Sequence, residues 1–133
     1  MFRLTLAALI SLASPAVADR IIADANCAPT EIDLRFNCEF NLTQNGVPVE
    51  GASFTIKPDM PSMPMAHNIP PVPADITERP GAYVAVLDLQ MLGDWTLTLD
   101  VSAPRRDRIV LSQIFDDAAS DHLPTEHSGH SSD

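Results

Sequence analysis

The segment Met60-Pro61-Ser62-Met63-Pro64-Met65-Ala66-His67 contains the side chains of this chain that are best suited to hold a soft metal ion. Three of the chain's five methionines stand in it, beside one of the four histidines. Thioether sulfur is a soft ligand that selects Cu(I), and imidazole is a common copper ligand. A thioether also needs no deprotonation before it binds. The segment therefore predicts a Cu(I) site.

Two prolines set the spacing of these ligands. Pro61 and Pro64 fix their own φ and push the residue before each of them toward extended backbone. In an extended segment, side chains at every second position share a face. The spacing predicts three ligands on one face: Met63, Met65 and His67. Two candidates for a further ligand are Met60 and Met91. The alternative is that the methionines are hydrophobic filling, because thioether side chains pack well into irregular gaps.

A second group of metal-binding side chains stands in the C-terminal stretch 116–133, which holds His122, His127 and His130 among acidic residues. The stretch is poor in apolar residues, which predicts a disordered tail. Imidazoles and carboxylates can collect Cu(II) or Zn(II), but ordering such a tail costs entropy. We expect weak secondary metal binding there, with solvated histidines as the alternative.

The two cysteines, Cys27 and Cys38, form an even pair in a small chain. In an oxidising compartment such a pair predicts a disulfide, which would stabilise the domain by roughly 2–4 kcal/mol. The alternative is a thiolate metal pair, but the ten residues between them match no standard zinc spacing.

The N-terminus has the pattern of a cleaved secretory signal, with Arg3, an apolar run from Leu4 to Leu12 and the small-residue site Ala16-Val17-Ala18. Spanning a bilayer takes about 20 apolar residues, so this shorter run predicts no stable membrane anchor. We expect a periplasmic protein that begins at Asp19. Loss of Arg3 leaves 7 basic against 18 acidic residues, a net charge of −11, which argues against nucleic acid as a partner.

Alternating apolar and polar residues, most regular over 32–42, predict strands rather than helices. We expect an all-β, immunoglobulin-like β-sandwich over 19–115, between a signal peptide at 1–18 and the tail at 116–133. An Asn45-Gly46 hairpin turn follows the first strand, and 58–80 is a proline-rich and methionine-rich loop. Trp95 is the expected main core aromatic. The predicted strands are 32–42, 47–57, 82–89, 95–101 and 108–115. Gly51 is expected to mark a bulge in the second of them.

Three motifs together resemble the YtkA-like domain, which is related to the FixH family. They are the methionine-rich stretch ending in His67, the segment Pro80-Gly81-Ala82-Tyr83, and Met91-Leu92-Gly93-Asp94-Trp95. The resemblance implies an immunoglobulin-like sandwich, and FixH proteins are associated with copper delivery during respiratory oxidase assembly. Unlike FixH proteins, this chain has an N-terminus that is expected to be cleaved rather than anchored.

These observations favour a soluble periplasmic Cu(I) chaperone or buffer over an enzyme. The chain has no G-x-S-x-G, no H-E-x-x-H and no phosphate-binding glycine loop. The expected partners are copper and a copper-receiving envelope protein, such as an oxidase assembly partner. The alternative is a metal-free interaction module that helps an envelope complex, such as a respiratory oxidase, to assemble.

Overall fold

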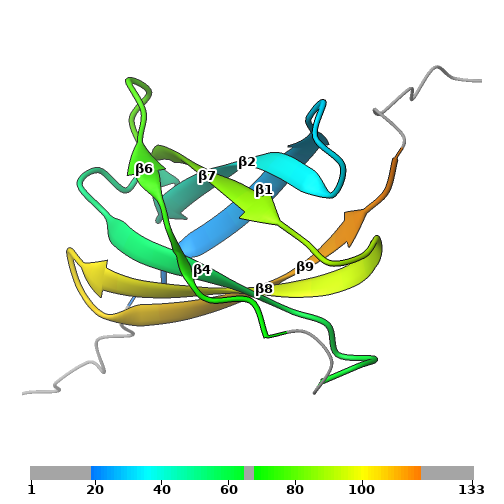
Figure 1. Ribbon diagram of the computed structural model, residues 1–133. Helices are drawn as coiled ribbons and strands as arrows, with labels where there is room; N and C mark the ends of the chain where they lie inside the picture. The colour runs from blue at the N-terminus through cyan, green and yellow to red at the C-terminus, as the bar shows by residue number, and fades with distance from the viewer. Residues whose placement is uncertain (1–18, 65–67, 118–133) are drawn as a thin grey trace, which may run out of the picture.

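Two antiparallel sheets lie face to face in the part of the chain that the structure describes (Figure 1). The structure is a computed structural model that describes residues 19–64 and 68–117. Several sequence predictions therefore lie outside the described residues: the signal peptide at 1–18, Met65, His67, and His122, His127 and His130 of the tail.

The strand order is that of an immunoglobulin domain. The first sheet has the order β1 (Ile22–Pro29), β2 (Arg35–Gln44), β7 (Ala82–Asp88) and β6 (Asp75–Ile76), and β3 (Val47–Pro48) also pairs with β2. The second sheet has the order β5 (Val72–Pro73), β4 (Ser53–Asp59), β8 (Gly93–Ala103) and β9 (Asp107–Phe115). These orders correspond to strands A-B-E-D facing C′-C-F-G. The predicted all-β, immunoglobulin-like sandwich is confirmed. Residues 19–64 and 68–117 contain no helix long and apolar enough to cross a membrane.

The core lies between the sheets, where alternate residues of each central strand point inward. In β8 the inward residues Trp95, Leu97, Leu99 and Val101 are all buried. Trp95 is 1% exposed, so its predicted place in the core is confirmed. Aromatic rings join the sheets edge to face, because Phe40 of β2 and its cross-strand partner Tyr83 of β7 both pack against Phe54 of β4.

Three strands were predicted at nearly their observed bounds, and two predictions need correction. The strand predicted from Ile32 begins at Arg35, because residues 30–35 form a turn in which Leu34 has a φ of 58° and Ile32 stays exposed. The segment 47–57 is two strands rather than one. Its first residues close the predicted Asn45-Gly46 hairpin as β3, and Gly51 marks the crossing to β4 in the other sheet rather than a bulge.

Strand β1 was not predicted, and the 58–80 loop is shorter than expected. The inward residues of β1 include Ala23, Ala25 and Cys27, which are too small to give a visible apolar alternation. Pro58 is buried within β4, and the short strands β5 and β6 lie inside the expected loop.

Tyr83 satisfies the buried backbone where the chain crosses between the sheets. Its hydroxyl donates to the Val49 carbonyl at 2.6 Å and accepts a hydrogen bond from the Ala52 N–H at 2.9 Å. Gly81, two residues earlier, has a φ of 74°, and a Cβ on it would lie 2.8 Å from Pro48 Cβ. The Pro-Gly-x-Tyr motif is therefore the structural support of this crossing.

The disulfide between Cys27 and Cys38 joins directly opposite residues of β1 and β2, and its prediction is confirmed. Cys38 is buried on the core side of the sheet, and Cys27 is half-buried. The bond therefore fixes the edge strand, whose inward side chains are mostly small, to the centre of its sheet.

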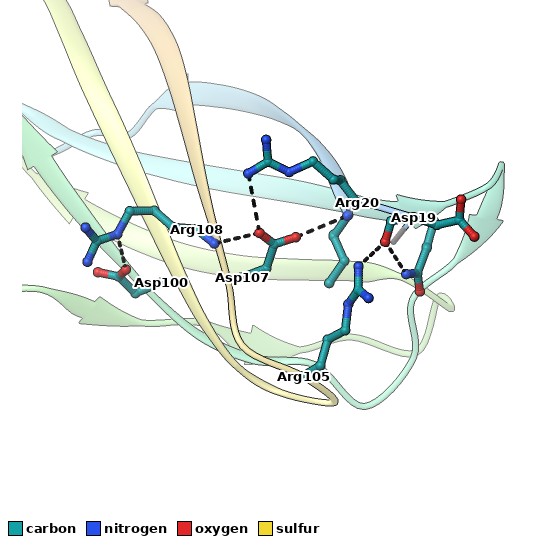
Figure 2. Close-up of polar contacts among 8 residues, drawn as sticks. Asp19, Arg20, Asp100, Arg105, Asp107 and Arg108 are labelled. Carbon is teal, nitrogen blue, oxygen red and sulfur yellow. Dashed lines mark hydrogen bonds and ion pairs between the residues drawn. The ribbon is translucent and has the colours of Figure 1, made fainter. Parts of the chain in front are cut away.

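The residues just before β1 are held by the β8–β9 hairpin and the β2–β3 turn (Figure 2). The Asp107 carboxylate accepts hydrogen bonds from the Ile21 and Arg108 backbone N–H groups at 3.2 and 2.9 Å. Arg105 donates to the Asp19 carbonyl, which also accepts a hydrogen bond from the Gln44 amide. The described chain is thus attached to the sandwich from its first residue.

Replacing Tyr83 with Phe is expected to lower the free energy of unfolding by about 1–3 kcal/mol, because a buried carbonyl and a buried N–H both lose their partner. Urea unfolding measures this loss. Val84→Thr, at the exposed neighbouring position, is the control and should change stability by less than about 0.5 kcal/mol. Equal stability of Tyr83→Phe and the wild type would contradict the assigned role.

The protein purified without reductant is expected to show no free thiol until it is reduced. Replacing both Cys27 and Cys38 with Ala should lower the unfolding free energy by about 2–4 kcal/mol, and reduced wild-type protein should unfold at a similar urea concentration. Thiol titration with and without denaturant is the measurement. Two titratable thiols in the native protein purified without reductant would argue against the bond.

Candidate functional site

Met60 and Met63 belong to a tight turn that follows β4. The Met63 N–H donates to the Met60 carbonyl at 3.1 Å, which closes the turn over Pro61 and Ser62. Proline suits the first central position of such a turn, because its φ is fixed near the required value. The Met60 side chain is buried and that of Met63 is exposed, so the turn carries one thioether inside and one at the surface.

Met91 belongs to the turn between β7 and β8. Its carbonyl accepts a hydrogen bond from the indole N–H of Trp95 at 3.1 Å, while its own side chain is exposed. Gly93, where β8 begins, has a φ of 133°, which side-chain-bearing residues rarely adopt. The position of a Cβ on Gly93 would be 3.5 Å from Met60 Cε, so this turn packs against the Met60 side chain.

The two turns enclose one open hollow of about 400 Å³. Residues 60–63 line one side of it and residues 91–94 line the other. The hollow therefore brings together three methionines from two distant parts of the sequence: Met60, Met63 and Met91. We call it the methionine hollow.

The structure tests the predicted ligand set only in part. Met63 lines the methionine hollow, as do Met60 and Met91, which were predicted only as candidates for a further ligand. Residues 60–63 form a turn, so the extended spacing assumed for the loop does not begin before Met63. The roles of Met65 and His67 stay predictions, as do those of the three tail histidines. Cys27 and Cys38 are bonded to each other.

Sequence reasoning missed how Met91 reaches Met60. The spacing Met-x-Gly-x-Trp is visible in the sequence. The hydrogen bond from the Trp95 indole N–H to the Met91 carbonyl, however, depends on the folded backbone. The nearest sequence signal is the glycine two residues before a core tryptophan at a strand start.

Carboxylates surround this end of the sandwich. Asp94 lines the methionine hollow, and Asp116 and Asp117 follow Phe115, which pairs with Gly93. Lys57 donates to Asp59 at 2.7 Å nearby on β4. A negative field of this kind favours the approach of cations. Within residues 19–64 and 68–117 no group of three or more His, Cys, Asp or Glu side chains is arranged to hold a metal ion.

An ion pair fixes the strand that leads into the Met91 turn. Arg35 of β2 donates to the Asp88 carboxylate through Nε at 2.6 Å and through Nη2 at 3.2 Å. The hydrogen bond from Arg35 lowers the pKa of Asp88 below its ordinary value. One residue later, the Leu89 N–H donates to the Leu34 carbonyl at 2.9 Å. The end of β7 is therefore fixed to β2 before the chain turns.

Comparison with known proteins identifies the family of this sandwich. The family model described as YtkA-like matches residues 30–100. This range includes the Pro-Gly-x-Tyr motif at 80–83 and the Met-x-Gly-x-Trp motif at 91–95. The chain therefore belongs to the YtkA-like family. A search of curated proteins found no match, and neither did a search of solved structures.

The Arg35–Asp88 pair predicts a pH effect on stability. Because the folded pKa of Asp88 is lowered, its contribution is present above the unfolded Asp pKa, about 3.9, and is lost as the pH falls through the folded pKa. Arg35→Gln should therefore lose less stability than the wild type between pH 6 and pH 2. The measurement is urea unfolding at each pH.

The control for this effect is Arg106→Gln. The Arg106 side chain makes no ion pair or hydrogen bond to any residue in the described ranges, so the variant should keep the wild-type slope. If the unfolding free energy of Arg35→Gln changes with pH as steeply as that of the wild type, the ion pair adds no pH dependence.

Proposed function

We propose that this protein binds Cu(I) in the periplasm and acts as a copper chaperone or buffer rather than as a catalyst. The observation that carries the proposal is the methionine hollow, an open hollow lined by methionines from two separate turns. Neutral soft sulfur ligands favour Cu(I) over harder ions. They also keep their binding capacity in a compartment that oxidises paired cysteines.

The geometry suggests how the ion would be held. Met60 is 4% exposed and would form the floor of the site, while Met63 and Met91, at 38% and 36%, are accessible to an incoming ion. These three thioethers suffice for a three-coordinate site. Met65 and His67 stand two and four residues after Met63 in the sequence, so we propose that either adds a ligand.

Open access suits transfer as well as storage. A site made of exposed side chains on two turns lets a second protein approach the ion, and the carboxylates around it would favour a basic partner surface. We propose that the receiving partner is a copper-requiring envelope protein or its assembly factor. The secretory signal predicted at 1–18 supports export to the compartment where such partners work.

Replacing Met60, Met63 and Met91 together with Leu is expected to remove stoichiometric Cu(I) binding by the protein that begins at Asp19. Leucine keeps the volume and apolar character of methionine, so the loss would reflect the missing sulfur atoms. The measurement is an anaerobic titration in competition with a Cu(I) chelator, with urea unfolding as the check on the fold. Undiminished affinity in the triple variant would refute the site.

Two further variants define the ligand set. A Met65→Leu, His67→Asn variant measures what the adjoining segment adds, and its affinity decides whether the site extends beyond the methionine hollow. Leu92→Met adds a thioether to the lining of the same hollow without removing one, and should retain Cu(I) binding. Ile22→Leu, on an exposed position of β1, is the neutral control.

A further inference from the structure

The signature Met-x-Gly-x-Trp, which spans Met91 to Trp95, joins a surface methionine to the core of the sandwich. Trp95 lies near the start of β8, paired with Gln113 of β9, and its ring is 1% exposed. Buried in this way, the indole has little freedom to move. Its N–H nevertheless donates to a carbonyl in a turn whose own side chains are largely exposed.

We infer that Trp95 is a positioning residue for the Cu(I) site: its indole N–H holds the Met91 carbonyl and so fixes the Met91 thioether beside Met60. The inference rests on the proposed function for its copper consequence. The hydrogen bond of 3.1 Å connects the rigid core to the residue that bears the ligand. Without it, the turn would have one fewer attachment to the sandwich.

Gly93 sets the backbone path of the same turn beside Met60. Its φ of 133° directs the chain from Met91 into β8, and a Cβ at this position would lie 3.5 Å from Met60 Cε. Each residue of the signature thus has a separate task. Met91 supplies sulfur, Gly93 allows the backbone path against Met60, and Trp95 anchors that path to the core.

Positioning matters here because thioethers are neutral ligands with flexible side chains. Methionine has three rotatable side-chain bonds, so a site of three methionines gains affinity when the backbone already holds the sulfur atoms close together. Groups that orient metal ligands typically change metal affinity by about 10–100-fold. Loss of the indole N–H should therefore be measurable as loss of Cu(I) affinity.

Tyr83 provides a matched control within the same protein. Like Trp95 it is a buried aromatic residue whose polar hydrogen is donated to a backbone carbonyl, that of Val49. It acts where the chain crosses between the sheets, next to Pro48 and Gly81, and lines no part of the methionine hollow. Trp95→Phe and Tyr83→Phe remove the same kind of bond, but only the first should affect copper.

The experiment compares Trp95→Phe, Tyr83→Phe and wild-type protein in two measurements. Chelator competition gives the Cu(I) affinity, which should fall by about tenfold or more in Trp95→Phe and stay within about twofold in Tyr83→Phe. NMR relaxation of the methionine methyl groups in metal-free protein should show increased motion of Met91 in Trp95→Phe only. If Trp95→Phe fails to fold, benzothienylalanine in place of Trp95 keeps the bicyclic ring, lacks the N–H and is measured instead.

The two measurements separate this inference from the proposed function. If the wild type binds no Cu(I), the proposed function fails, while the methyl relaxation still decides whether Trp95 positions Met91. Equal methyl motion in all three proteins would overturn the positioning role. Increased motion of Met91 with undiminished Cu(I) affinity would show that the positioning by Trp95 does not matter for copper binding. Equal losses of affinity in Trp95→Phe and Tyr83→Phe would show that the loss reflects lower stability in general.

Discussion

The sandwich depends on satisfying the buried backbone between β3 and β4, where the chain leaves one sheet and enters the other. Val49 and Ala52 are both buried there, and unpaired polar groups in an apolar interior are costly. The single hydroxyl of Tyr83 serves both of them. Because Tyr83 pairs with Phe40 on β2, the register of β7 fixes the point at which the second sheet starts.

The other end of the sandwich uses the same physical device for a different purpose. Trp95 is also an amphipathic aromatic residue, with its ring in the core and its polar hydrogen at a backbone carbonyl. Tyr83 holds the buried residues Val49 and Ala52, where the chain crosses from one sheet to the other. The chain held by Trp95 is a surface turn that carries an exposed thioether. Two similar bonds therefore support the architecture in one place and the candidate site in the other.

Periodicity predicted the fold where large apolar residues alternate, as in β8, and failed where size or backbone conformation hid the pattern. The inward residues of β1 are mostly small, so its alternation is invisible without its partner strand. The apolar residues Ile32 and Leu34 continue the alternation of β2 into a turn that only backbone geometry reveals. The division of 47–57 between two sheets likewise depends on tertiary pairing.

The amino-acid composition of the segment that begins at Met60 predicted a candidate metal site, but the sequence did not predict which residues lie together in space. A cluster of soft ligands identified the segment that begins at Met60, and local spacing then favoured neighbours along that segment. The described structure adds that Met91, predicted only as a further candidate, lines the same hollow as Met60 through the pairing of β4 with β8 and the turn that precedes β8. Contacts of this kind arise from strand register, which a single sequence does not specify.

The segment just before β1 and the turn that leads into β8 lie at opposite ends of β9 (Figure 1). Asp107, which holds the chain before β1, opens that strand, and Phe115, the partner of Gly93, closes it. Nine residues of strand separate the two points by roughly 30 Å. If the protein is immobilised on a surface through the segment before β1, the arginine-bearing hairpin therefore lies next to that surface, and the exposed side chains of Met63 and Met91 lie at the far end of the sandwich.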